Sequence, residues 1–202
     1  QMAHRRNDSG PVNHTMLRGL LQRALGQDET TRSPVILLYH SVATRNSDPW
    51  NLSISPQHFA EHLAVLRQFG EPIALSALVR GLMESRLPAH AFVVTFDDGY
   101  ADTYHNAFPI LRRYQIPATV FVIVGSIESG EVAWYDKTFL ALKVYPGATL
   151  EIELDRIRRF SLDSPAARLS AAMQINQWLR TVPERRRREF CAAFERRFAL
   201  PP

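Results

Sequence analysis

The chain has 202 residues, of which 46% are hydrophobic and 22% are charged, and its formal net charge at pH 7 is +4. This composition excludes disorder along the whole chain and predicts a globular protein that can bury a sizeable core. The single cysteine, Cys191, excludes an internal disulfide and a cysteine-based zinc cluster, which leaves histidines and carboxylates as candidate metal ligands.

The first part of the chain begins with an apolar strand and an amphipathic helix. The apolar run at 34–40 ends at His40 and predicts a buried strand. A helix is predicted to begin at Ser55 and Pro56, which are typical cap and first-turn residues, and to end at Gly70. Its apolar positions at helical spacing are Phe59, Leu63 and Leu66.

Two further strands with a short helix between them follow. Residues 72–75 predict a short strand, and Ser76 is expected to cap a helix that runs to Met83. The unbroken apolar run at 91–96, preceded by Pro88, predicts another buried strand.

The alternation continues with a helix over 102–114, closed by Pro117, and a fourth buried strand at 118–125. The apolar stripe predicted for this helix consists of Tyr104, Phe108 and Leu111. All-apolar strands that alternate with helices predict an α/β fold with a parallel sheet, either an open doubly wound sheet or a (β/α) barrel.

The pattern changes after Gly125. Residues 126–160 are mixed, with helical spacing at 134–145 and an alternating strand or edge hairpin at 148–154. From Ser164 onward the sequence predicts two amphipathic helices packed as a hairpin. The residues expected on their packing faces are Leu169, Met173, Ile175, Leu179, Phe190, Phe194 and Phe198.

The most basic stretch is Arg185–Arg188, at the start of the last predicted helix. We expect these arginines largely in solvent, because nucleic-acid binding needs base-stacking aromatics and the nearby phenylalanines are used for packing. No nucleic-acid partner is therefore expected. No run approaches the ~18 apolar residues of a membrane span, and the N-terminal residues lack the apolar centre of a secretory signal, so the cytoplasm is favoured.

The stretch AFVVTFDDGYAD, residues 91–102, places two carboxylates directly after a buried strand. Asp97 and Asp98 repel each other and lose hydration where they are partly buried, so such a pair needs compensation. A metal ion or a shared proton would supply it. The alternative is that Asp97–Gly99 is only a turn, since Asp-Gly pairs are frequent in turns.

Three motifs in a fixed order, PVILLYHSV, TFDDGYAD and IPATVFV, resemble the polysaccharide deacetylase family, also called the NodB-homology or carbohydrate esterase family 4 domain. The resemblance covers residues 34–140. It implies a distorted (β/α) barrel of the TIM-like kind and a hydrolase that removes acetyl groups from sugar polymers with a divalent metal, most often zinc. It also implies that Asp97 is the general base that activates a metal-bound water, that Asp98 holds the metal, and that His40 lines the site.

Adjacent residues can serve these two roles for a geometric reason. Successive residues at a strand end point in different directions, so that one carboxylate can bind an ion while the other hydrogen-bonds a water. Barrel strands present such residues at their C-terminal ends, where His40, Asp97 and Asp98 are all expected.

The sequence departs from the family in the rest of the metal site. The family uses a His-Ser/Thr-x-x-x-His motif after the aspartate pair, and this chain does not contain one. Of its seven histidines only His105 follows Asp98, and it is expected to be exposed or to pack on its helix. His58 and His62 are expected to be surface residues of the first helix.

Two explanations are open. In the first, 1–33 is an N-terminal extension, 34–125 is the first part of the barrel and 126–202 is a mostly helical insertion, so that this chain alone is inactive and the complete protein is the enzyme. In the second, the protein is a non-catalytic carbohydrate-binding or scaffolding protein that has lost its metal ligands. Four strands cannot close a barrel, which favours the first explanation. The partner is an acetylated polysaccharide or glycan in either case, and the polymer and the linkage of its acetyl groups are left open.

Overall fold

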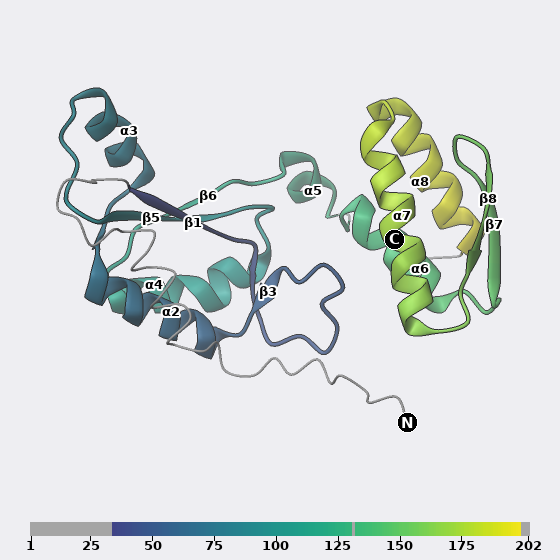
Figure 1. Cartoon of the computed structure of the whole chain (residues 1–202), viewed down its shortest axis with the longest axis horizontal. Helices are drawn as coiled ribbons and strands as arrows, with labels where there is room; N and C mark the ends of the chain where they lie inside the picture. Colours follow the sequence, from purple (N-terminus) through teal and green to yellow (C-terminus); the bar gives the residue numbers. More distant parts are fainter. Residues whose placement is uncertain (1–33, 131, 199–202) are drawn as a thin grey trace. The chain divides into compact units, whose positions relative to one another are not determined.

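The computed structural model describes residues 34–130 and 132–198, which fall into two compact units (Figure 1). The first unit reaches Ile123 and the second begins at Val124. The N-terminal extension expected over residues 1–33 lies outside the described residues. The fold is mixed α/β, as the sequence predicts, and no described helix combines the length and apolar character needed to cross a membrane.

A parallel sheet forms the centre of the first unit. Its middle strand is β5 (Ala91–Phe96), which pairs with β1 (Val35–Tyr39) along one side. On its other side, β4 (Glu71–Pro72) pairs with the beginning of β5, and β6 (Ala118–Val120) pairs with its end. The prediction of four parallel strands is confirmed, but the prediction that β1 and β6 are buried is wrong, since Ile36 and Leu38 are each 54% exposed and Val120 is 42% exposed.

Two of these strands are shorter than their apolar runs suggest. The strand expected at 72–75 keeps only Pro72 in the ladder, because α3 (Leu75–Met83) begins three residues later. The strand expected at 118–125 leaves the ladder after Val120, although the backbone N–H of Phe121 still donates to the carbonyl of Phe96 at 2.7 Å.

The helix predicted to begin at Ser55 and Pro56 is confirmed as α2 (Pro56–Phe69). The Ser55 hydroxyl accepts a hydrogen bond from the backbone N–H of His58 at 3.2 Å, which satisfies one of the unpaired donors of the first turn. The helix ends at Gly70, where a Cβ would lie only 2.3 Å from the carbonyl oxygen of His90. Glycine is needed there because two backbone segments approach each other closely.

The predicted cap of the next helix is wrong. Ala74, not Ser76, precedes α3, and its carbonyl accepts hydrogen bonds from the backbone N–H groups of Ala77 and Leu78 at 2.9 and 3.0 Å. Ser76 lies within the first turn. A serine near a helix start therefore indicated the helix but misplaced its beginning by two residues.

The helix expected over 102–114 is present, but its buried face differs from the prediction. It consists of a π-helical turn, η1 (Thr103–Ala107), followed by α4 (Phe108–Tyr114). Tyr104 and Phe108 are 69% and 46% exposed, which contradicts the predicted apolar stripe. Leu111 is buried as predicted, and the other buried positions are Thr103 and Ala107.

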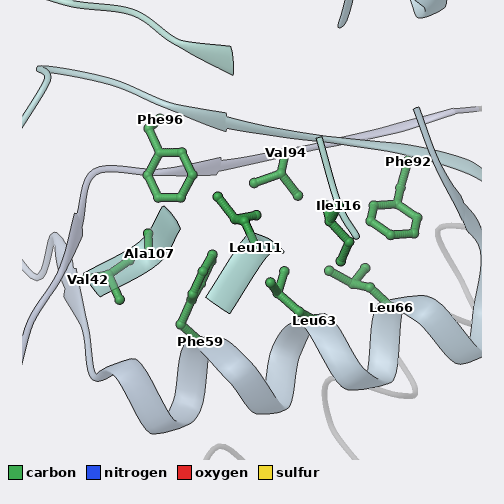
Figure 2. Packing of buried hydrophobic residues seen from close by; sticks show 10 residues of the cluster. All are labelled: Val42, Phe59, Leu63, Leu66, Phe92, Val94, Phe96, Ala107, Leu111 and Ile116. Carbon is green, nitrogen blue, oxygen red and sulfur yellow. The ribbon is translucent and has the colours of Figure 1, made fainter. Parts of the chain in front are cut away.

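The core of the first unit lies between α2, α4 and one face of β5 (Figure 2). Phe92, Val94 and Phe96 occupy alternate positions of β5 and therefore share a face of the sheet. The three apolar residues predicted for α2 pack against this face, and none of them is exposed. They are Phe59, Leu63 and Leu66.

The second unit is mostly helical in its described part, and it contains one antiparallel hairpin. The hairpin confirms the strand expected at 148–154, and α7 and α8 confirm the two expected helices, each of which packs against α6. The elements are α5 (Val124–Ser129), α6 (Trp134–Val144), β7 (Thr149–Glu153), β8 (Ile157–Ser161), α7 (Pro165–Thr181) and α8 (Glu184–Phe198).

The predicted packing face of α8 is confirmed, whereas that of α7 is partly wrong. The rings of Phe190 and Phe194 stack at 5.4 Å, and those of Phe194 and Phe198 lie 4.4 Å apart. On α7, Ile175 and Leu179 are fully buried, but Met173 is 55% exposed. The small residues Ala171 and Ala172 are buried in its place, because they allow α7 to approach its neighbours closely.

The arginine run is only partly in solvent. The side chains of Arg185 and Arg188 are 91% and 78% exposed, as predicted. Arg187 contradicts the prediction, because its side chain is only 24% exposed and its guanidinium lies over the Trp134 ring. Trp134 offers this cation an aromatic face that cannot be foreseen from the run itself.

The core of the first unit generates a stability prediction. Leu63→Ala removes a fully buried side chain from α2 and should lower the free energy of unfolding by about 2–5 kcal/mol. Leu82→Ala on α3 is the matched control, since Leu82 is 57% exposed and its truncation should change stability by no more than about 0.5 kcal/mol. Urea denaturation followed by circular dichroism checks this, and equal effects of the two substitutions would contradict the described core.

Candidate functional site

The carboxyl ends of β1 and β5 meet at one edge of the sheet. Tyr39 is opposite Phe96 in the parallel register, and the backbone N–H of Asp97 donates to the carbonyl of Tyr39 at 3.0 Å. His40 follows Tyr39 directly, so that His40 and Asp97 leave the two strands side by side. The predicted convergence of these residues at the same end of the sheet is confirmed.

A tight turn follows β5 and separates the two carboxylates. The backbone N–H of Gly99 donates to the carbonyl of Asp97 at 2.9 Å, and the residue between them, Asp98, has a φ of +70°. A bond from residue i+2 to residue i with a positive central φ is typical of a strained γ-turn. Gly99 also has a positive φ, +75°, and a Cβ there would lie 3.0 Å from a methyl group of Val122.

The strain at Asp98 is informative about the site. A residue with a side chain costs free energy in the left-handed region, and such conformations persist only where surrounding structure holds them. The turn changes the direction of the chain between Asp97 and Gly99, and Asp98 is its central residue. A change of direction at this point would let two adjacent carboxylates take different roles.

The loop after β1 is fixed by a side chain that the sequence analysis did not single out. Asp102 accepts hydrogen bonds from the Ser41 hydroxyl at 2.8 Å and from the backbone N–H of Val42 at 2.9 Å. Arg45 donates to the same carboxylate at 3.0 Å. One signal could have found Asp102: it lies four residues before Asn106, so that two polar side chains share one helical face.

A small second sheet supports the same loop. Strand β2 (Ser41–Val42) pairs in parallel with β3 (Ser53–Ile54), and the hydroxyls of Ser41 and Ser53 lie 3.2 Å apart. Ser41 and Val42 are buried. The residues that follow His40 therefore belong to the packed part of the unit.

Two histidines away from the carboxyl ends of β1 and β5 differ in their exposure. His105 is exposed on η1, as predicted. His62 is not a surface residue, which corrects the prediction: its Nδ1 lies 3.2 Å from the hydroxyl oxygen of Tyr39, and it contacts the Tyr39 ring. Burial raises the pKa of the Tyr39 phenol, so this group stays neutral and can donate to an unprotonated histidine nitrogen.

The described residues do not form a complete metal site. Within 34–130 and 132–198, no three side chains of histidine, cysteine, aspartate or glutamate lie close enough together to hold an ion. Asp97, Asp98 and His40 are thus insufficient as a ligand set in this arrangement. A metal of the kind used by polysaccharide deacetylases would need donors from outside the described residues.

An apolar groove of ≈730 Å³ begins at the turn after β5 and runs between η1, α4 and β6. Gly99 and Tyr100 line it at the turn, and Val120 and Val122 line it at the sheet. The aromatic rings of Tyr104 and Phe108, which the sequence analysis assigned to the core, stack in its wall at 5.8 Å. The exposed aromatic stripe is therefore a surface of this groove.

The strained turn generates a prediction about stability. Asp98→Gly should raise the free energy of unfolding by up to about 1 kcal/mol, because glycine adopts a φ of +70° without strain. The gain is limited by the greater freedom of glycine in the unfolded chain, worth about 0.5–1 kcal/mol. Asp97→Gly is the control, since Asp97 has no positive φ, and it should lower stability. Chemical denaturation checks both, and equal losses would show that Asp98 is not strained.

Comparisons with known proteins agree with the resemblance seen in the motifs. Residues 84–152 match the family model for polysaccharide deacetylases. A Bacillus subtilis protein described as a polysaccharide deacetylase, YxkH, is 35% identical over 94 residues, which cover 46% of this chain and 32% of the relative. The poly-beta-1,6-N-acetyl-D-glucosamine N-deacetylase of Escherichia coli K12 is also 35% identical over 94 residues, covering 46% of this chain and 14% of the enzyme.

Solved structures of deacetylases match a similar share of the chain. The Streptococcus pyogenes deacetylase PplD, in complex with acetate, is 31% identical with a TM-score of 0.45, and the match covers 51% of this chain and 48% of PplD. IcaB from Ammonifex degensii is 34% identical with a TM-score of 0.42, covering 48% of this chain and 40% of IcaB. The chain thus spans about a third or less of the first two relatives and less than half of these structures. Residues 84–152 thus match the polysaccharide deacetylase family model, and about half of the chain is similar in sequence to proteins described as deacetylases.

Proposed function

We propose that this chain is part of a metal-dependent hydrolase that removes acetyl groups from a polysaccharide or another acetylated sugar. The observation that carries the proposal is the strained turn at the end of β5, which separates Asp97 from Asp98 beside His40. Backbone strain of this kind clusters at active sites. The match to the polysaccharide deacetylase family model supports deacetylation as the reaction at this turn.

Asp97 is the proposed general base. Its backbone N–H continues the ladder between β5 and β1, which fixes the start of its side chain, and the side chain is only partly buried. A partly exposed carboxylate can accept a proton from a water molecule that attacks an acetyl carbonyl. His40 leaves the neighbouring strand next to it and is proposed to line the same site.

Asp98 is the proposed carboxylate ligand of a zinc ion or another divalent metal. The described residues do not complete such a site, because no three donor side chains gather within 34–130 and 132–198. The two histidines that the family carries in a His-Ser/Thr-x-x-x-His motif are therefore proposed to come from a further part of a longer protein. Asp98 is the proposed point on this chain toward which they would converge.

The distorted (β/α) barrel of the family is also a proposal for this protein. Both α2 and α4 pack on the face of β5 that carries Phe92, Val94 and Phe96. On β1, the side chains of Ile36 and Leu38 are each 54% exposed, as expected for strand residues that point into the interior of an unfinished barrel. Within the described ranges β6 pairs only with β5, so a further strand could extend the sheet at this edge.

The substrate is proposed to be a polymer of N-acetylated glucosamine. Relatives from Escherichia coli and Staphylococcus epidermidis are named for the N-deacetylation of poly-beta-1,6-N-acetyl-D-glucosamine, and they are 35% and 30% identical to this chain over the aligned residues. Acetate release from this polymer, compared with release from an O-acetylated xylan, tests the choice of substrate. A cytoplasmic location remains a prediction from the sequence.

A second candidate function is a non-catalytic carbohydrate-binding or scaffolding protein. The absence of a three-donor group among the described residues favours it over an enzyme that is complete in this chain. A protein of this kind would bind the polymer without releasing acetate and would not depend on Asp97.

The role of Asp97 can be tested in the longer protein. Asp97→Asn should lower the rate of acetate release by about 10²–10⁴-fold, because the amide cannot accept the proton, while the metal content stays unchanged. Asp98→Asn should instead lower the metal content. Asp155→Asn is the control, since Asp155 forms an exposed ion pair with Arg158 in the second unit. Full activity of Asp97→Asn would overturn the assignment.

The isolated 202-residue chain should bind zinc weakly and release no acetate. The physical reason is that its described residues hold fewer than three gathered donors, whereas structural and catalytic zinc sites use at least three protein ligands. Isothermal titration with zinc and an acetate assay check this expectation. Stoichiometric, tight zinc binding that Asp98→Asn abolishes would show that the ligand set is already present in this chain.

A further inference from the structure

Asp102 gathers donors from three different residues of the loop after β1. They are the Ser41 hydroxyl at 2.8 Å, the backbone N–H of Val42 at 2.9 Å and the Arg45 guanidinium at 3.0 Å. The Asp102 side chain is only 13% exposed, whereas that of Arg45 is 42% exposed. Hydrogen bonds to an ionised carboxylate are shorter and stronger than neutral ones, so this group is a firm attachment for the loop.

Asn106 completes the attachment from the next turn of the same helix. Its side-chain amide donates to the carbonyl of Val42 at 2.8 Å, while Asp102 accepts from the N–H of the same residue. Both polar groups of the Val42 backbone are thus bound by side chains that lie four positions apart. Asp102 and Asn106 thus bind the backbone of Val42 in the way that the backbone of a neighbouring strand would.

This attachment bears directly on His40. The carbonyl of Tyr39, just before His40, accepts the backbone N–H of Asp97, and Ser41, just after it, donates to Asp102. His40 is therefore held between two bonds to the segment that carries Asp97 and Asp98. We propose that Asp102 is a positioning residue, which sets His40 against the two carboxylates of the site described above; this inference rests on the proposed function.

The kinetic test uses Asp102→Asn in the longer protein. This variant keeps the shape of the side chain but places an amide where Asp102 accepts from Ser41 and Arg45, so kcat for acetate release should fall about 10- to 100-fold with little change in KM. In a protein that already carries His40→Ala, adding Asp102→Asn should lower kcat little further, because Asp102 acts through His40. Ser41→Ala, which removes one donor, should give a smaller loss in the same direction.

A second readout does not depend on activity. With histidines labelled with ¹³C and ¹⁵N, and the His40 signal assigned from the His40→Ala spectrum, Asp102→Asn should shift or broaden that signal. Asp155→Asn, which breaks an exposed ion pair in the second unit, should leave the signal unchanged. Circular dichroism confirms that each variant is folded.

The outcomes separate the two proposals. If the unaltered protein releases no acetate, the proposed function fails, and the His40 signal still decides the inference. An unchanged His40 signal in folded Asp102→Asn would overturn the positioning role. The positioning role would also be overturned if Asp102→Asn lowered kcat as much in the His40→Ala variant as in the unaltered protein.

Discussion

The first unit depends on the burial of β5 along its whole length. All six residues of this strand are buried, because β1 flanks one edge, β4 and β6 flank the other, and α2 covers one face. Such a strand cannot carry ionised side chains without a large desolvation cost. Charged groups can follow only where the strand ends, and the pairing of β1 with β5 brings the end of a second strand to the same place. The location of the candidate site is thus a consequence of the packing of the sheet.

The turn after β5 shows how two carboxylates can be kept adjacent. If the strand continued regularly, the side chains of Asp97 and Asp98 would point to opposite faces of the sheet, and one of them would point toward the core. The positive φ of Asp98 avoids this, because the chain leaves the sheet before a charged side chain must be buried. The conformation has a cost in backbone strain, and Gly99 makes the close approach to Val122 possible.

Local patterns in the sequence predicted the features that depend on local physics. The apolar runs gave the strands, and Ser55 with Pro56 placed the start of α2, because caps and periodicity act within a few residues. The parallel direction of the strands followed from their alternation with helices. The buried face predicted for the helix at 102–114 was wrong at Tyr104 and Phe108, and Asp102 was overlooked, because both depend on contacts with residues about sixty positions away. A complete set of metal ligands could not be predicted, because the sequence lacks the histidine motif of the family that it resembles.

The wrong buried positions on this helix and the overlooked role of Asp102 have one physical cause. Asp102 and Asn106 must face the loop after β1 in order to bind the backbone of Val42, and this fixes the rotation of the helix about its axis. Thr103 and Ala107 are then turned toward the core, and the larger rings of Tyr104 and Phe108 are turned outward into the wall of the groove.

A helix with an apolar stripe is normally oriented by that stripe. Here the partly buried hydrogen bonds to the backbone of Val42 go with a different rotation of the helix, and they offset the exposure of the two aromatic rings because a buried polar group without a partner is costly. The same side chains that attach the loop beside His40 therefore also open the apolar groove next to Gly99.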